Sequence, residues 1–161
     1  MKDSFTVSPI GYVRARQEGF FLEIAKEYIP GLKELSTFSH VNVLWWPHLS
    51  DSTENRFILE VEQPYKNSPP KMGIFATRSQ MRPNPIGLSV APILTVDHQR
   101  GIIQVPYIDT EDGTPIIDLK PYHPSIERIR EVSVPAWCSH WPKYYEESGS
   151  FDWAAEFVNA C

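Results

Sequence analysis

The sequence has little cysteine, and its cysteines form no recognisable pattern. The two, Cys138 and Cys161, lie far apart in a chain of 161 residues. They provide neither a disulfide framework nor the paired spacing of a zinc site. The five histidines also lack the i, i+4 spacing that ligates zinc. We therefore expect no metal centre, and we expect reduced thiols in a cytosolic protein.

Long apolar runs are missing as well. No window approaches the ~18 consecutive apolar residues that span a membrane. The N-terminal sequence MKDSFTVSPIG has no apolar core of signal-peptide length. Apolar residues nevertheless make up 42% of the chain, which is enough to bury a core. The sequence therefore predicts a soluble, cytoplasmic protein with one domain of ordinary size.

Glycine is scarce relative to proline, with 8 glycines against 15 prolines. Because proline is disfavoured inside helices and central strands, we expect many corners and few long helices. The alternating and β-branched stretches between the corners predict an all-β sandwich or barrel, with 87–96 and 101–109 paired as a hairpin. One short amphipathic helix is expected over Phe151–Asn159, with Ser150 as its N-cap. The predicted strands are 5–15, 38–46, 55–64, 73–79, 87–96, 101–109 and 116–122.

An overall excess of basic charge is also absent, because the formal net charge is −5. That value argues against a broad nucleic-acid-binding surface, which is usually basic. The middle of the chain differs, because no acidic residue lies between Glu62 and Asp97. This stretch suits a phosphate or a carboxylate ligand, or it forms an ordinary solvated face. Its basic residues are Lys66, Lys71, Arg78 and Arg82.

The glycine-rich motifs of nucleotide-binding proteins are missing. The chain has no Walker loop and no G-x-G-x-x-G, which argues against a nucleoside triphosphatase and a Rossmann site. The segment GLSVA around Ser89 lacks the second glycine of a nucleophile elbow. The sequence therefore does not predict an α/β-hydrolase.

The segment EDGTPIIDLKPY, residues 111–122, combines a turn with a polar strand. Asp112 and Gly113 predict a tight turn whose free backbone groups face outward and suit the edge of an adenine or a ribose. Asp118, Lys120 and Tyr122 alternate along an extended segment and are expected to share one face. They form a candidate reactive cluster, or alternatively the polar surface of an edge strand.

Three segments in this order, FSHVNVLWWPH, MGIFATRSQMRPNPIGLS and DGTPIIDLKPY, resemble the TsaA-like (TrmO) family of S-adenosylmethionine-dependent tRNA methyltransferases. The resemblance runs from Phe5 to Pro124. It implies a compact antiparallel β-barrel with short helices, and a homodimer that binds S-adenosyl-L-methionine close to the subunit interface. It also implies N-methylation of threonylcarbamoyl-adenosine beside the anticodon of tRNA.

The methyl transfer that the resemblance implies suggests roles for individual residues. Asp118 and Tyr122 are candidates to orient or deprotonate the methyl acceptor, and Lys120 to hold a phosphate or a carboxylate. Arg82 and Asn84 are expected to hold the proline-containing turn within ATRSQMRPNPIGLS, residues 76–89, by hydrogen bonds to its carbonyls. The implied cofactor contacts are His48, Leu49, Arg78, Leu88, Asp112, Gly113, Thr114 and Pro115.

Two departures from the family pattern keep other functions open. The "PRQ"-like segment that contributes to the cofactor site in the family is matched only partly here, by Arg16-Gln17. The extra C-terminal domain of longer bacterial members is replaced by a Trp-rich acidic tail over 132–161. We expect this tail to pack on the methyltransferase domain of residues 1–131, or on a partner subunit. A methyltransferase acting on a small molecule and a non-catalytic cofactor-binding module remain alternatives.

Overall fold

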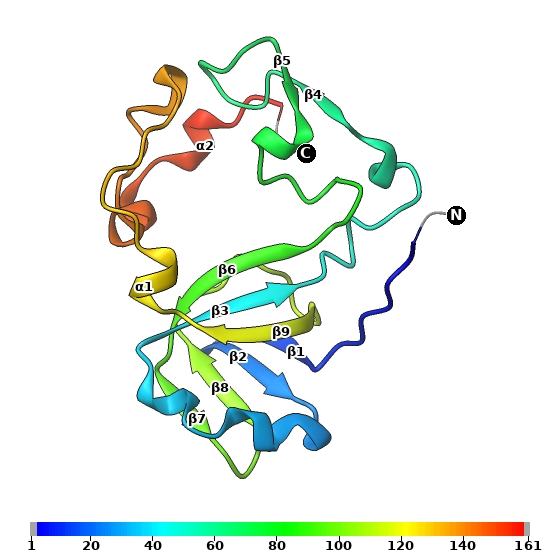
Figure 1. The fold of residues 1–161 in the computed structure, drawn as a ribbon, viewed down its shortest axis with the longest axis vertical. Helices are drawn as coiled ribbons and strands as arrows, with labels where there is room; N and C mark the ends of the chain where they lie inside the picture. Colours follow the sequence, from blue (N-terminus) through cyan, green and yellow to red (C-terminus); the bar gives the residue numbers. More distant parts are fainter. Residues whose placement is uncertain (1–2, 160–161) are drawn as a thin grey trace. The chain divides into compact units, whose positions relative to one another are not determined.

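A computed structural model describes residues 3–159 of the chain (Figure 1). The chain divides into two compact units, and each combines two separate stretches of sequence. The first unit comprises Met1–Leu49 and Pro85–Arg128, and the second comprises Ser50–Asn84 and Ile129–Cys161. The predicted tail therefore belongs to the same unit as residues 50–84. Cys161 lies outside the described residues.

The first unit contains a seven-stranded antiparallel sheet (Figure 1). The strand order is β6-β3-β9-β1-β2-β8-β7. Alternation of apolar and polar residues along each strand sends one set of side chains to the core and the other to solvent. The strands are β1 (Gly11–Arg16), β2 (Gly19–Ile24), β3 (His40–Trp45), β6 (Gly87–Pro92), β7 (Thr95–Asp97), β8 (Ile102–Val105) and β9 (Pro115–Pro121).

The two edge strands of this sheet, β6 and β7, follow one another in the sequence. Only Ile93 and Leu94 separate them. The Ile93 N–H donates to the Ser39 carbonyl at 2.8 Å, and the Leu94 N–H donates to the Gln104 carbonyl at 2.9 Å. The sheet must therefore curve until its edges meet at this corner. Closure into a complete barrel, which the family resemblance implied, stays a prediction.

The core of the first unit lies on the inner face of the curved sheet. Trp45 is its largest buried side chain, and the indole N–H donates to the Ser89 hydroxyl at 3.0 Å. A Cβ added at Gly87 would overlap the Trp45 ring, so the start of β6 requires glycine. The aliphatic core residues are Val13, Leu22, Ile24, Leu32, Leu35, Val41, Val43, Ala91, Ile103, Val105, Ile108 and Ile116.

Short helices complete the first unit: the 3₁₀ helices η1 (Lys26–Leu32) and η2 (Leu35–Thr37), and the α-helix α1 (Pro124–Glu127). The Glu127 carboxylate accepts a hydrogen bond from the His123 N–H at 2.7 Å. It also accepts one from the amide of buried Asn42 on β3. These two bonds attach α1 to the sheet just after β9.

The second unit has a two-stranded antiparallel sheet of β4 (Glu60–Glu62) and β5 (Lys71–Gly73). Val61, Met72 and Ile74 form its buried aliphatic cluster, against which Tyr65 and Trp137 pack. Its remaining helices are η3 (Asn55–Phe57), η4 (Ile74–Ala76), η5 (Ala136–Cys138), η6 (Tyr145–Ser150) and α2 (Trp153–Glu156). No helix in the described part of the chain combines the length and apolar character needed to cross a bilayer.

The strand predictions were correct for β3 and β9 and partly wrong elsewhere. The predicted strand 5–15 forms only from Gly11, and 55–64 reduces to β4. In 73–79, only Gly73 belongs to a strand, and Ile74–Ala76 form η4. The first arm of the predicted hairpin, 87–96, breaks at the corner between β6 and β7. Only the short β7 pairs with β8, while β6 pairs with β3. The predicted turn is present, and Gly101 has a φ of 70° there.

The predicted C-terminal helix over 151–159 was wrong in length, and its predicted cap was also wrong. Asp152, not Ser150, caps α2 by accepting a hydrogen bond from the Ala155 N–H at 3.1 Å. The helix ends at Glu156 because Phe157 pairs with Tyr65 in an isolated antiparallel bridge. A tertiary strand pairing therefore takes precedence over the helical periodicity of the tail.

Candidate active site

The Asp112–Pro115 turn is attached to β1 by its own backbone. Gly113 has a φ of 78°, which favours glycine. The Gly113 N–H donates to the Val13 carbonyl at 2.9 Å, and the Val13 N–H donates to the Thr114 carbonyl at 2.8 Å. The Asp112 carboxylate accepts from the Ala15 N–H at 3.0 Å. The expectation of free backbone groups at Asp112 and Gly113 was therefore wrong for the Gly113 N–H. The carboxylate and the carbonyl oxygens still have acceptor capacity.

The His48–Leu49 turn follows β3 at the same end of the sheet as the Asp112–Pro115 turn. The Trp46 N–H donates to the Pro115 carbonyl at 2.9 Å, which joins the end of β3 to the start of β9. The His48 N–H then donates to the Trp46 carbonyl at 2.7 Å and turns the chain. His48 and Leu49 are both exposed. The structure therefore brings the two predicted cofactor turns to adjoining strand ends.

Leu88 lies at this end of the sheet on the third strand involved. In the register, Leu44 of β3 pairs with Leu88 of β6 on one side and with Asp118 of β9 on the other. Leu88 and Asp118 are therefore two strand spacings apart, roughly 10 Å. Leu88 is 46% exposed. A predicted cofactor contact and a predicted acceptor residue thus lie in line across three strands.

A β-bulge adjoins Asp118. The partner on β9 steps from Asp118 opposite Leu44 to Ile116 opposite Trp45, so Ile117 is the extra residue. Bulges bend a strand locally and redirect its side chains, and they are frequent next to active sites. Sequence reasoning did not predict this bulge, because Ile-Ile within a strand looks like a regular apolar pair.

Asp118, Lys120 and Tyr122 share a face, as predicted. Lys120 pairs with Asn42 two residues along β3 from Leu44, and the Tyr122 N–H donates to the His40 carbonyl at 3.0 Å. The Lys120 ammonium lies 2.7 Å from the Asp118 carboxylate. The hydrogen bond to this carboxylate raises the pKa of Lys120.

Further contacts fix the two ends of this polar row. Asp118 also accepts from the Leu119 N–H at 2.9 Å. The Tyr122 ring meets the His40 ring edge-on, with centroids 6.2 Å apart. The row therefore presents a carboxylate, an ammonium group and a phenol in a fixed order along β9 and its extension.

Arg14 is a residue near the Asp112–Pro115 turn that the sequence reasoning did not single out. A Cβ built at Gly113 would lie 3.9 Å from the Arg14 guanidinium. Glu23 holds this guanidinium at 3.0 Å and also pairs with Arg16. Arg14 lies only two residues before Arg16-Gln17, the partial match to the PRQ-like family motif. That proximity was the signal in the sequence that could have identified Arg14.

Arg78 belongs to the second unit, in the loop after η4. Side-chain hydrogen bonds hold this loop: the buried Thr77 hydroxyl donates to the Ile74 carbonyl at 2.9 Å and accepts from the Ser79 N–H at 3.2 Å. Arg82 donates to the same Ile74 carbonyl at 3.3 Å. This carbonyl precedes the proline-containing segment 76–89, so the predicted hydrogen bonds of Arg82 and Asn84 to carbonyls within that segment stay a prediction.

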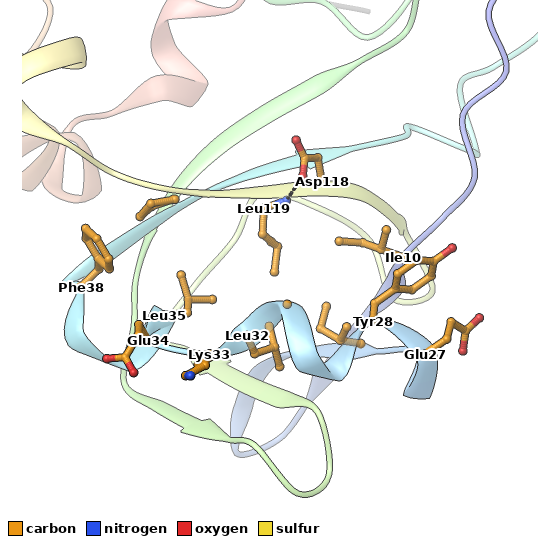
Figure 2. Close-up of a pocket in the computed structure, with 13 residues that line it drawn as sticks. Ile10, Glu27, Tyr28, Leu32, Lys33, Glu34, Leu35, Phe38, Asp118 and Leu119 are labelled. Atoms are coloured by element: carbon orange, nitrogen blue, oxygen red, sulfur yellow. Dashed lines mark hydrogen bonds between the residues drawn. The ribbon is translucent and has the colours of Figure 1, made fainter.

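A pocket of about 440 Å³ lies beneath β9 in the first unit (Figure 2). Of the predicted site residues, only Asp118 lines it. Figure 2 shows the Asp118 carboxylate on one side of β9, and the Leu119 side chain on the other side, pointing toward η1. The pocket therefore lies mainly on the opposite side of β9 from the Asp118 carboxylate.

Comparison with known proteins identifies the family. The model for the tRNA-methyltransferase O N-terminal domain matches residues 6–128, most of the chain. The chain belongs to this family. A probable S-adenosyl-L-methionine-binding protein of Pyrococcus horikoshii is 36% identical over 118 residues, which cover 73% of this chain and 82% of that protein.

Other members of the TrmO family are longer than this chain. The tRNA (adenine(37)-N6)-methyltransferase of Escherichia coli is 36% identical over 104 residues, 63% of this chain and 43% of that protein. A crystal structure of TrmO from Pseudomonas aeruginosa has a TM-score of 0.65 and 27% identity, covering 84% of this chain and 62% of that chain. The chain thus spans less than two thirds of these two relatives. Residues 129–161 lie beyond the family match.

Proposed function

We propose that this protein uses S-adenosyl-L-methionine to methylate tRNA, at a nitrogen of threonylcarbamoyl-adenosine beside the anticodon. The observation that carries the proposal is the alignment of Leu88, Leu44 and Asp118 across three strands. It puts an apolar surface beside a polar row at the end of the sheet where the Asp112–Pro115 turn lies. Membership of the TrmO family supports the same reaction.

The residues at this end of the sheet suit an adenosyl group. Leu88 and Leu49, 46% and 72% exposed, offer apolar side chains against which the face of an adenine packs. The exocyclic amine and the ribose hydroxyls need acceptors. The Asp112 carboxylate has about four acceptor positions, of which the Ala15 N–H uses one. His48, Gly113, Thr114, Pro115 and Arg78 complete the proposed set of cofactor contacts.

The polar row suits the acceptor. When bound, the cofactor supplies a methyl group that its sulfonium makes electrophilic, so the protein has mainly to orient the attacking nitrogen. That nitrogen loses a proton during methylation, and Asp118 and Tyr122 are the groups proposed to direct or accept it. Lys120 lies 2.7 Å from the Asp118 carboxylate and adds positive charge for a phosphate or a carboxylate of the acceptor.

The proposal includes tRNA as partner, a cytoplasmic location and a homodimer. A second candidate is a small-molecule acceptor, which the net charge of −5 and the acidic tail favour because both repel an RNA backbone.

Methyl transfer from labelled S-adenosyl-L-methionine into two fractions of one cell extract separates the two acceptors. We expect label in nuclease-sensitive tRNA, declining steeply with salt because phosphate contacts release counterions. Nucleoside analysis then identifies the modified base. Label confined to the small-molecule fraction would contradict a tRNA acceptor, and cofactor binding without any transfer would contradict an enzyme.

A further inference from the structure

The tail supplies most of an aromatic cluster around Tyr65 in the second unit. The Tyr65 ring stacks on Trp137, with centroids 5.4 Å apart and an interplanar angle of 10°. It meets Trp141 edge-on at 5.0 Å, and it meets Phe157 at 5.8 Å with the two rings tilted by 44°. We call these four residues the tail cluster. Aromatic pairs in such geometries stabilise one another beyond the area they bury.

The backbone of the tail holds the same segment. Tyr65 and Phe157 form an antiparallel bridge. On either side of it, the Lys66 N–H donates to the Glu156 carbonyl at 2.9 Å, and the Val158 N–H donates to the Pro64 carbonyl at 3.1 Å. Tyr65 is therefore fixed through both its ring and its main chain.

A buried carboxylate orients the tail cluster. Glu156 is 8% exposed, and it accepts from the Trp141 indole N–H at 3.1 Å and pairs with the His140 ring at 3.0 Å. These two hydrogen bonds, the one to His140 being the larger cause, lower the pKa of Glu156. Trp141 is thereby held in the orientation in which its ring meets Tyr65.

The tail cluster connects to the Arg78 loop in two ways. Tyr65 and Trp137 pack against the cluster that contains Ile74, and the Ile74 carbonyl accepts the hydrogen bonds that hold the loop. Tyr65 also bonds to the loop directly. Burial raises the pKa of the Tyr65 phenol, and a backbone hydrogen bond from Arg78 opposes that rise. A bond with this effect favours the phenolate, so the Arg78 N–H is the donor.

We propose that Tyr65 is a positioning residue for Arg78: the C-terminal tail fixes Tyr65, and the Tyr65 hydroxyl fixes the backbone from which the Arg78 side chain reaches its ligand. This inference rests on the proposed function, because that ligand is taken to be S-adenosyl-L-methionine. It gives the tail, which lies beyond the family match, a role in cofactor affinity. A loop fixed in advance in this way loses less conformational entropy when the ligand binds.

The substitution Tyr65→Phe tests the inference, because it removes the hydroxyl and keeps the ring. The matched control is Tyr144→Phe, at a tail tyrosine that is 65% exposed. In full-length protein without cofactor, we expect hydrogen exchange in the peptide 74–82 to become several-fold faster in Tyr65→Phe and to stay unchanged in Tyr144→Phe. Unchanged exchange in Tyr65→Phe would overturn the inference.

Calorimetry with S-adenosyl-L-methionine then tests the connection to the cofactor. The loss of one hydrogen bond is expected to weaken binding about 5-fold in Tyr65→Phe, and Arg78→Ala is expected to weaken it about 10- to 100-fold. If Tyr65 acts through Arg78, adding Tyr65→Phe to Arg78→Ala causes no further loss. An additive loss would overturn the inference. Unchanged affinity in Arg78→Ala, with faster exchange in Tyr65→Phe, would also overturn it and would locate the error in the proposed function.

Discussion

The two units hold their predicted site residues in different ways. In the first unit, Leu88, Asp118 and Lys120 lie on paired strands, so ladder hydrogen bonds set their spacing. In the second unit, Arg78 lies in a loop beyond a strand of only three residues. Side-chain hydrogen bonds and the tail cluster take the place of a ladder there. A sheet positions side chains through the register of its strands. A loop is positioned instead by hydrogen bonds and packing contacts of other side chains.

The largest effect is expected from Asp118→Asn. This substitution tests the catalytic role of a carboxylate that the sheet of the first unit positions. Because a positioned acid or base typically contributes about 10²–10⁴-fold, we expect kcat to fall about 100-fold. Cofactor affinity should be unchanged, since the backbone ladder stays intact. Steady-state methyl transfer and calorimetry measure the two quantities.

The control for this substitution is Asp109→Asn, at an exposed aspartate of the same unit. It should change neither quantity. Loss of cofactor binding in Asp118→Asn would assign Asp118 to the cofactor rather than to the acceptor. Cofactor and acceptor contacts would then not occupy separate positions along β9.

Gly87→Ala should have the next largest effect, because it disturbs the register that presents Leu88. The added Cβ would overlap the Trp45 ring, and overpacking of this kind costs about 1–3 kcal/mol. The matched substitution in the second unit is Gly73→Ala in β5. Gly73 has nothing within 4 Å of an added Cβ and has an extended backbone with a φ of −66°.

Urea unfolding of the two variants measures the difference. Gly73→Ala should be neutral or stabilising by up to about 1 kcal/mol, because alanine reduces the entropy of the unfolded chain. If both substitutions destabilise the protein equally, close packing is not what distinguishes the sheet from the loop-rich unit.

Sequence reasoning worked best where the chain follows a local rule. The β-branched run of β3 and the Asp-Gly turn before β9 were both predicted, and so was the shared face of Asp118, Lys120 and Tyr122. It failed where the decisive contact is distant in sequence. Ile93 and Leu94 look like the middle of a strand, and only their different partners, Ser39 and Gln104, show that they form a corner.

The same limit applies to the candidate site. The resemblance named residues around two turns, but no local pattern states that Trp46 bonds to Pro115 and brings these turns together. In the tail, the pairing of Phe157 with Tyr65, ninety-two residues earlier (157 − 65), ends a helix that periodicity extended to Asn159. The tail cluster combines two such distant stretches, so the sequence alone could not associate the tail with Arg78.

The smallest effect is expected from the pH dependence of the Glu156 contact, which tests whether a buried ionic contact stabilises the second unit. The pKa of Glu156 is lowered in the folded protein, chiefly by the hydrogen bond to His140. This carboxylate therefore contributes stability that is fully present above its unfolded value of 4.5, and that is lost as the pH falls through the lower folded pKa. The side chain of Glu156→Gln does not titrate, so this variant should be less stable than the parent at pH 6. The difference in stability between the two proteins should become smaller toward pH 3.

The control is Glu60→Gln, which removes the exposed Lys71–Glu60 pair of the same unit. Exposed pairs contribute little, so this variant should follow the parent closely across the pH range. Thermal unfolding of the three proteins at several pH values provides the comparison. If the difference in stability between the parent and Glu156→Gln is the same at every pH, the side chain of Glu156 acts through its shape and its hydrogen bonds alone. The tail cluster would then depend on neutral packing, as the sheet does, and the contrast between the two units would rest on backbone pairing rather than on charge.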